Sequence, residues 1–92
     1  MAPNKPYAVS LATRAAKEVR RLPEKTQSAV FEALDFLAAD PRAGKPLSGE
    51  LVGIWSMRRG DYRILYRIND QARRVEVARV GHRREVYRRS RR

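Results

Sequence analysis

Apolar residues recur with a different period in each half of the chain, and the first half has the period of helices. Residues 7–11 alternate in the manner of a short strand, and Thr13 then caps a predicted helix. A second helix is predicted from Pro23, which suits a first helical turn, to the stop at Asp40-Pro41. The apolar positions at helical spacing are Ala15, Ala16, Val19, Leu22, Val30, Ala33, Leu34 and Leu37, with Phe31 and Phe36 widening the second stripe. The sequence therefore predicts two antiparallel helices joined at Leu22-Pro23.

The second half has the period of strands. Residues 42–50 are rich in glycine and proline and are predicted to form a loop. Strands are predicted over residues 53–58, 62–69 and 74–80, joined by a tight turn at Arg59-Gly60 and a looser one over residues 69–73. In the middle strand Tyr62, Ile64, Tyr66 and Ile68 share one face.

The position of the predicted turn also predicts which residues face each other across the first hairpin. A turn at Arg59-Gly60 would set Met57 opposite Tyr62 and Ser56 opposite Arg63. Apolar side chains would then face the helices, while Ser56, Arg58 and Arg63 would share the open face. We therefore expect an α+β fold in which two antiparallel helices pack on one face of a small, mainly antiparallel four-stranded sheet.

Charge is concentrated in the strand-forming half. The formal net charge is +11 over 92 residues. Residues 1–41 carry six Lys and Arg against five Asp and Glu, whereas residues 42–92 carry fifteen against five. A polyanion is the expected partner of the second half, and nucleic acid is the commonest polyanion. The simpler alternative is a solvated cationic surface.

Composition excludes several classes of protein. One histidine and no cysteine cannot build an ordinary zinc site, and no carboxylate pair suggests a magnesium clamp. Neither a serine-hydrolase elbow nor a Gly-rich phosphate loop is present, so we expect no metal and no cofactor. No apolar stretch is long enough for a membrane span or a secretory signal, and the expected location is the cytoplasm.

The remaining chemistry lies in a dense set of arginines together with His82 and Tyr87. Such a set can cleave RNA without a metal if the substrate's own 2′-hydroxyl attacks the adjacent phosphate. Guanidinium groups would stabilise the developing charge, His82 could transfer a proton, and Tyr87 could stack a base. Taken singly, each residue also has an ordinary explanation: Arg63 could pair with Asp61, His82 could be solvated, and Tyr87 could dock the chain end.

Three segments together carry a more specific signal. They are residues 44–51, residues 55–66 and residues 80–87. The most diagnostic parts are Arg58-Arg59-Gly60-Asp61-Tyr62-Arg63 and Gly81-His82-Arg83-Arg84-Glu85-Val86-Tyr87. These segments resemble the RelE-like toxins of the RelE/ParE toxin–antitoxin superfamily, and actinobacterial members most. The resemblance covers residues 1–87 as a single domain and leaves residues 88–92 as a basic tail.

The resemblance implies a ribosome-dependent, metal-independent endonuclease that cuts messenger RNA in the A site, held by an acidic RelB-like antitoxin. By position, Arg63 matches the phosphate-stabilising arginine, Arg83 the arginine that assists the leaving group, and Tyr87 the tyrosine at the attacked nucleotide. His82 lies where some relatives place a catalytic histidine. The further RNA-binding candidates are Lys45, Arg58, Arg59 and Arg84.

One departure from the family pattern concerns the proton acceptor. The best-known member has lysines on the first hairpin strand, whereas this chain has Ile54 and Ser56 there. Arginine is a poor base near neutral pH, so His82 and Glu85 are the local candidates. Two other functions remain open: a ParE-like poison of DNA gyrase, and an RNA-binding domain with little or no catalytic activity.

Overall fold

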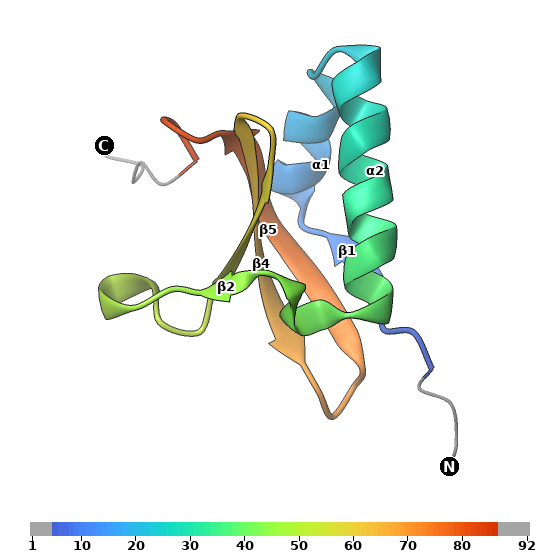
Figure 1. Cartoon of the computed structure of the whole chain (residues 1–92), viewed down its shortest axis with the longest axis vertical. Coiled ribbons are helices and arrows are strands. Elements are labelled where there is room, and N and C mark those ends of the chain that lie inside the picture. Colours follow the sequence, from blue (N-terminus) through green and yellow to red (C-terminus); the bar gives the residue numbers. More distant parts are fainter. Residues whose placement is uncertain (1–4, 87–92) are drawn as a thin grey trace.

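The computed structural model describes residues 5–86 and contains two helices on one side of a five-stranded sheet (Figure 1). The helices are α1 (Thr13–Arg20) and α2 (Glu24–Ala39), and two single-turn 3-10 helices, η1 (Pro41–Ala43) and η2 (Gly49–Leu51), follow them. The strands are β1 (Ala8–Leu11), β2 (Lys45–Pro46), β3 (Trp55–Arg59), β4 (Tyr62–Asn69) and β5 (Arg74–His82). No helix in residues 5–86 is long and apolar enough to cross a membrane.

The two helices form the predicted antiparallel pair, with corrections in detail. The chain rises through α1 and returns through α2 (Figure 1). Thr13 is the first residue of α1 and not its cap; Ala12 precedes the helix in extended conformation, without a side-chain capping bond. Phe31 and Phe36 are 47% and 55% exposed, so they do not widen the buried face of α2. The inner face of α2 is filled by four other core positions, and Phe31 lines an open surface pocket with Val9 and Leu11 of β1.

The sheet has one strand more than the sequence predicted, in the order β1-β5-β4-β3-β2. The additional strand, β2, lies within the predicted loop and pairs antiparallel with β3. At the other edge β1 runs parallel to β5, while the remaining pairs are antiparallel. The prediction of a four-stranded sheet was therefore wrong, since a strand of two residues, one of them a proline, gives no periodic signal.

The β3–β4 hairpin turns at Gly60-Asp61 and not at Arg59-Gly60. Arg59 pairs with Tyr62, and Arg58 pairs with Arg63. Gly60 has a φ of 59°, a conformation that the first residue of a tight hairpin turn needs and that Arg59 would adopt only under strain. The predicted pairing was thus displaced by two residues along the partner strand. Because side chains alternate with a period of two, this displacement left every side chain on its predicted face.

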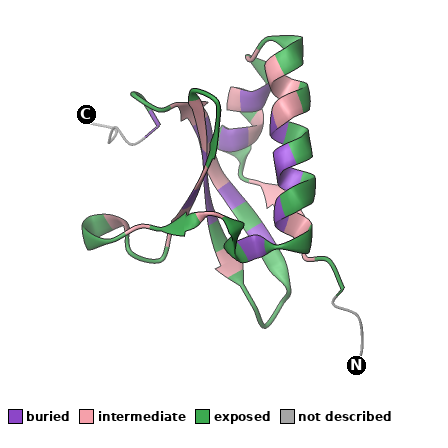
Figure 2. Ribbon diagram, viewed as in Figure 1, coloured by how far each residue is buried: buried purple, intermediate pink, exposed green. Residues whose placement is uncertain are grey.

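The core fills the space between the helices and the sheet (Figure 2). Its buried members are Ala15, Val19, Val30, Ala33, Leu34, Leu37, Ile64, Tyr66, Val75, Val77 and Val80. The alternation in β4 that predicted this face is confirmed, since Ile64 and Tyr66 are fully buried. The opposite face of β3 and β4 carries the polar side chains of Ser56, Arg58 and Arg63, together with the buried Leu65.

Candidate nucleic-acid interface

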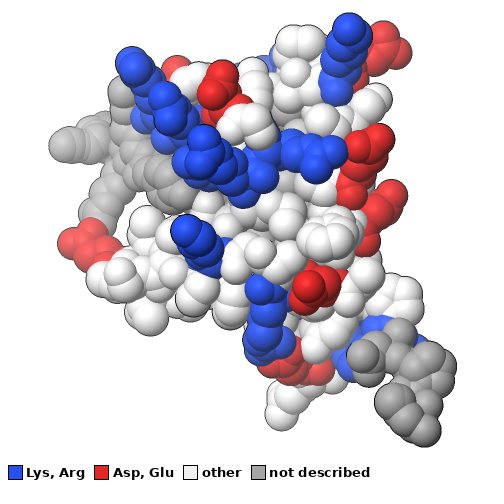
Figure 3. Space-filling view, viewed as in Figure 1, with Lys and Arg blue, Asp and Glu red and all other residues white. Residues whose placement is uncertain are grey.

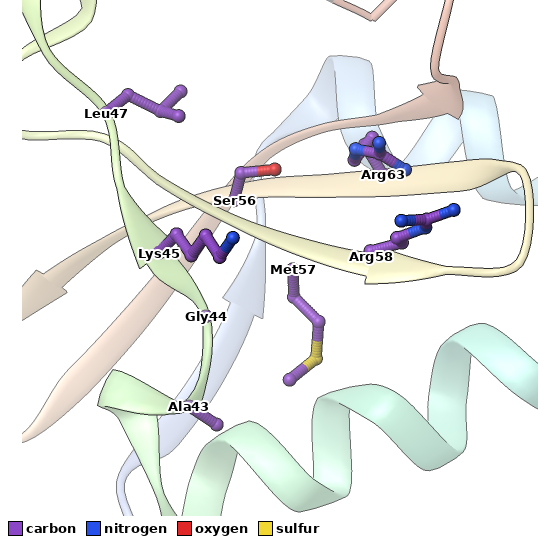
Figure 4. Close-up of a pocket in the computed structure, with 8 residues that line it drawn as sticks. All are labelled: Ala43, Gly44, Lys45, Leu47, Ser56, Met57, Arg58 and Arg63. Atoms are coloured by element: carbon purple, nitrogen blue, oxygen red, sulfur yellow. The ribbon is translucent and has the colours of Figure 1, made fainter.

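The open face of the sheet holds a pocket of about 420 Å³ between β2, β3 and β4. Its polar side chains are Lys45, Ser56, Arg58 and Arg63. Lys45 is paired directly with Ser56, and Arg58 with Arg63, so these four side chains share one face. In Figure 4 the four side chains lie on one side of the hairpin, while Met57 points toward α2. The structure therefore brings together three of the sequence-predicted residues.

Positive charge in this pocket is not neutralised by any carboxylate among the residues that the structure describes. Neither Arg58 nor Arg63 forms an ion pair with a carboxylate of residues 5–86. Nη1 of Arg63 is a buried side-chain nitrogen without a hydrogen-bond partner in this part of the chain. A buried donor without an acceptor costs about 1–3 kcal/mol, more when it is charged. An anionic ligand oxygen would supply the missing acceptor, so the pocket has the chemistry of an anion site.

The side chain of Tyr66 holds the segment that delivers Lys45. Its hydroxyl donates to the carbonyl oxygen of Pro41 at 2.7 Å and accepts the N–H of Gly44 at 3.2 Å. Burial raises the pKa of this hydroxyl above its usual value, so it stays protonated and can donate. Gly44 fits because it has no side chain: a Cβ there would lie 2.6 Å from both the Ser56 carbonyl oxygen and the Tyr66 hydroxyl.

A second set of contacts, centred on Asp70, ties the same segment to the far end of the sheet. Arg42 donates two hydrogen bonds to Asp70, at 2.7 and 3.1 Å, and the Tyr7 hydroxyl donates a third at 2.6 Å. The bonds from Arg42 and then from Tyr7 lower the pKa of the Asp70 carboxyl to about 2. The same guanidinium lies 5.8 Å from the centre of the Trp55 ring. The guanidinium of Arg42 is thus occupied by its contacts with Asp70 and Trp55 and is not available to a substrate.

Arg83 and Arg84 lie in the C-terminal turn, defined here as residues 83–86. Both side chains are exposed. The backbone N–H of Arg83 donates to the Asp61 carbonyl oxygen at 2.8 Å, which fastens this turn to the end of the β3–β4 hairpin. In the neighbouring strand pair Arg63 lies opposite Gly81, two residues before the turn. Val86 of the C-terminal turn packs over Gly81, where a Cβ would lie 3.6 Å from the Cβ of Val86, so the turn lies beside the β5 side of Arg63.

Two predicted residues lie apart from this pocket. Arg59 is paired with Tyr62 on the helix side and forms an ion pair with Glu32 of α2 at 2.9 Å. His82 is also paired with Tyr62, and the two rings meet edge to face at 5.9 Å. Its Nδ1 accepts the N–H of Arg84 at 3.2 Å, so His82 supports the C-terminal turn. Tyr87 and residues 88–92 lie outside the described residues.

The surface charge separates along the molecule. Lys and Arg side chains form a band over the hairpin side of the molecule, whereas acidic side chains follow α2 (Figure 3). Within the described range, no group of three His, Asp or Glu residues is placed to hold a metal ion. The site is therefore an extended cationic surface with one recessed anion pocket.

Sequence reasoning missed the residues that build the pocket wall. Gly44 and Tyr66 set the position of β2, and Arg42 anchors it from outside, yet residues 42–50 were predicted only as a loop. The signal that could have found them is the combination of a glycine and a basic residue directly before Pro46, where an edge strand begins.

Comparison with known proteins places this site in a family. Residues 9–87 match the family described as the ParE toxin of the type II toxin–antitoxin system, parDE. Toxin RelG of Mycobacterium tuberculosis is 46% identical over 86 residues, covering 91% of this chain and 99% of the relative. The chain belongs to the RelE/ParE superfamily of type II toxins.

Two further relatives place this RelE-like toxin on the RelE side of the superfamily. Toxin RelE of the same species is 41% identical over 90 residues, covering 96% of this chain and 93% of the relative. The crystal structure of the toxin–antitoxin complex RelBE2 from M. tuberculosis superimposes with a TM-score of 0.80 at 45% identity, covering 85% of this chain and 92% of that chain. The resemblance inferred from the sequence motifs is confirmed.

Proposed function

We propose that this RelE-like toxin is a ribosome-dependent endonuclease that cuts messenger RNA in the A site. The observation that carries the proposal is the pocket in which Arg63, with an unpaired buried Nη1, lies beside Arg58 and Lys45. The two relatives named RelG and RelE support the assignment to an RNA-directed toxin.

In the proposed mechanism the substrate supplies its own nucleophile. The 2′-hydroxyl gives its proton to a base, for which Glu85 is the remaining local candidate, and its oxygen attacks the adjacent phosphorus. The bond to the 5′-oxygen of the next nucleotide breaks, and that oxygen takes up a proton from solvent. The phosphate gains negative charge in the transition state, and Arg63 donates hydrogen bonds to it. Arg58 and Lys45 hold flanking phosphates, while Arg83 and Arg84 approach from the C-terminal turn. No step requires a metal, because guanidinium groups supply the positive charge.

Three of the sequence-predicted residues take other roles in this proposal. Tyr87 contacts the attacked nucleotide, as the family resemblance implies. His82 supports the C-terminal turn from the opposite face of the sheet and is assigned no contact with the phosphate. Arg59, held by Glu32 on the helix side of the sheet, is assigned no contact with RNA.

The decisive experiment maps the 5′ ends of cellular messenger RNA after brief induction of the protein. Cuts at a constant position within codons are expected, since the ribosome would present the substrate in frame. The Arg63→Ala variant, induced to the same level, should give no such cuts. Intact messenger RNA in cells that stop growing would contradict the proposal.

The partner we propose is an acidic RelB-like antitoxin in a heteromeric complex. The related M. tuberculosis structure is a toxin–antitoxin complex, and this chain carries a net charge of +11. An acidic segment that covers the cationic pocket would neutralise the toxin and be attracted over long range. Association with the product of the neighbouring gene should slow as salt rises. An association rate that does not depend on salt would contradict neutralisation by charge complementarity.

A second candidate follows from the family description, which names ParE toxins. Under that alternative the protein would poison DNA gyrase, and the location in either case would be the cytoplasm. The same induction experiment separates the two functions. Filamentation with DNA damage and unbroken messenger RNA would identify a gyrase poison.

A further inference from the structure

The carboxylate of Glu18, on α1, binds β5 at two neighbouring points. One oxygen accepts the backbone N–H of Val80 at 2.8 Å, and the other accepts Nε of Arg79 at 2.8 Å. The side chains of Glu18 and Arg79 are only 21% and 18% exposed. Charge-assisted bonds of this length in a half-buried setting fix both partners firmly. Arg14 is also near this carboxylate, at 3.7 Å, but its side chain is 55% exposed.

The position of Glu18 follows from the length of β1. The last β1 residue, Leu11, pairs with Val77, whereas β5 continues to His82. Beyond Leu11 the edge of β5 needs another acceptor, and Glu18 provides it at Val80. The ladder between β4 and β5 also shifts register here, because Leu65 pairs with Arg79 and Tyr66 with Val77. A β-bulge re-aims side chains next to it, and Arg79 adjoins this one.

Arg79 makes a second contact that reaches the candidate active site. Its Nη1 donates to the backbone carbonyl oxygen of Val86 at 3.3 Å. Val86 is 2% exposed, and its N–H donates to the carbonyl oxygen of His82 at 2.9 Å. The C-terminal turn is therefore held at Val86 by Arg79 and at Arg83 by the Asp61 carbonyl oxygen. One guanidinium bridges α1 and the turn that carries Arg83.

We propose that Glu18 and Arg79 are positioning residues that hold the C-terminal turn, and so Arg83, at the RNA-cleavage site. Glu18 orients the guanidinium, and the guanidinium orients the turn. The pair touches no substrate and acts through the turn. The inference rests on the proposed ribonuclease function.

Two substitutions test the bridge from Glu18 through Arg79 to Val86, one at each of the first two residues. Each removes one contact of the bridge and keeps the other. Glu18→Gln keeps an oxygen for Val80 N–H but removes the charge that orients Arg79. Arg79→Lys keeps a cation beside Glu18 but cannot also reach Val86, because a single ammonium replaces the fork. Arg14→Gln is the matched control, since Arg14 contacts the same carboxylate and no residue of the turn.

The assay is cleavage of ribosome-bound messenger RNA by the full chain. Small displacements of a reacting group cost on the order of 100-fold in rate, so both variants should lose about 10- to 100-fold at saturating ribosomes. The ribosome concentration for half-maximal rate should stay within about threefold, because the phosphate-binding pocket is untouched. Arg14→Gln should behave as wild type. In an Arg83→Ala background, Arg79→Lys should cause little further loss, since both changes remove the same contribution.

Hydrogen exchange at the Val86 amide gives a readout that does not depend on activity. Both test variants should exchange faster there, while Val30 in the core exchanges as in wild type. Wild-type cleavage rates in Glu18→Gln and Arg79→Lys, or full additivity with Arg83→Ala, would overturn the positioning role. A wild-type chain that cuts no RNA would instead refute the proposed function, and Val86 exchange would still decide whether Arg79 holds the turn.

Discussion

Arg58 and Arg63 lie directly opposite each other across the β3–β4 hairpin, with like charges on one face of the sheet. Directly opposed like charges destabilise a strand pair by up to about 1 kcal/mol. No carboxylate of residues 5–86 compensates either guanidinium. This arrangement weakens the hairpin and leaves Nη1 of Arg63 without a hydrogen-bond partner among these residues. A phosphate group bound between the two side chains would explain both features.

The first prediction concerns the trade between activity and stability at this pair. Arg63→Ala should reduce the rate of messenger-RNA cleavage by about 100- to 1,000-fold, the effect of losing one preorganised donor to a developing oxyanion. Its thermal stability should equal or exceed that of wild type, because the change removes repulsion and a buried unpaired donor. Arg63→Lys should recover only part of the rate, since a point charge cannot form a bidentate fork.

Arg67→Ala is the matched control for Arg63→Ala. Arg67 lies on the same strand and the same face as Arg63, but it is exposed. Its neighbour across the strand pair in β5 is Glu76. Its truncation should leave cleavage within about twofold, as expected for a surface change away from the site. Equal loss in both variants would indicate a general charge effect and would contradict the specific role of Arg63.

The second prediction concerns the nucleophile. A messenger RNA with one 2′-deoxy nucleotide immediately 5′ of the scissile phosphate should not be cut there, because the attacking oxygen is missing. Primer extension on the ribosome-bound substrate measures this directly. The same substitution one codon upstream is the control and should leave cleavage unchanged. Efficient cutting of the deoxy substrate would refute 2′-hydroxyl attack, whatever the protein variants did.

The third prediction tests the close approach at Gly44. Gly44→Ala places a Cβ 2.6 Å from the Ser56 carbonyl oxygen, and backbone cannot move aside as a flexible side chain would. We expect a loss of about 1–3 kcal/mol in the free energy of unfolding, measured by urea denaturation. Gly81→Ala is the control, because its Cβ would meet Val86 at an ordinary 3.6 Å. Similar stability for the two variants would show that residues 41–45 are not held as described.

The fourth prediction concerns acid stability. The pKa of Asp70 is about 2 in the folded chain, below its usual 3.8, so its charged form favours the folded state. This contribution is fully present above about pH 4 and is lost as the pH falls toward 2. Arg42→Gln should raise the Asp70 pKa toward 3.8 in a carboxyl-carbon NMR titration, because Arg42 is the largest cause. Arg73→Gln should raise it less, and a wild-type midpoint near 3.8 would refute the contacts at Asp70.

The sequence alone determined the elements with strong periodicity and the side chains on each face. The predicted bounds of β4 are those of the structure, and α2 ends at Ala39, directly before the predicted stop at Asp40-Pro41, because alternation and a proline stop are local signals. The face shared by Ser56, Arg58 and Arg63 was also correct. A displacement of the register by two residues cannot move a side chain to the other face of the sheet. The predicted face was therefore correct although the turn was predicted at Arg59-Gly60 and not at Gly60-Asp61.

Only the tertiary structure decided which of the basic residues work together. Arg42, Arg59 and Arg79 look like any other arginine in the sequence, yet each is committed to a carboxylate from a distant element: Asp70, Glu32 and Glu18. The short strand β2, which delivers Lys45, depends on the buried hydroxyl of Tyr66. Such contacts join residues 22 to 61 positions apart, and no periodic pattern encodes them. Local patterns specify elements and faces, whereas long-range pairing of charges specifies the site.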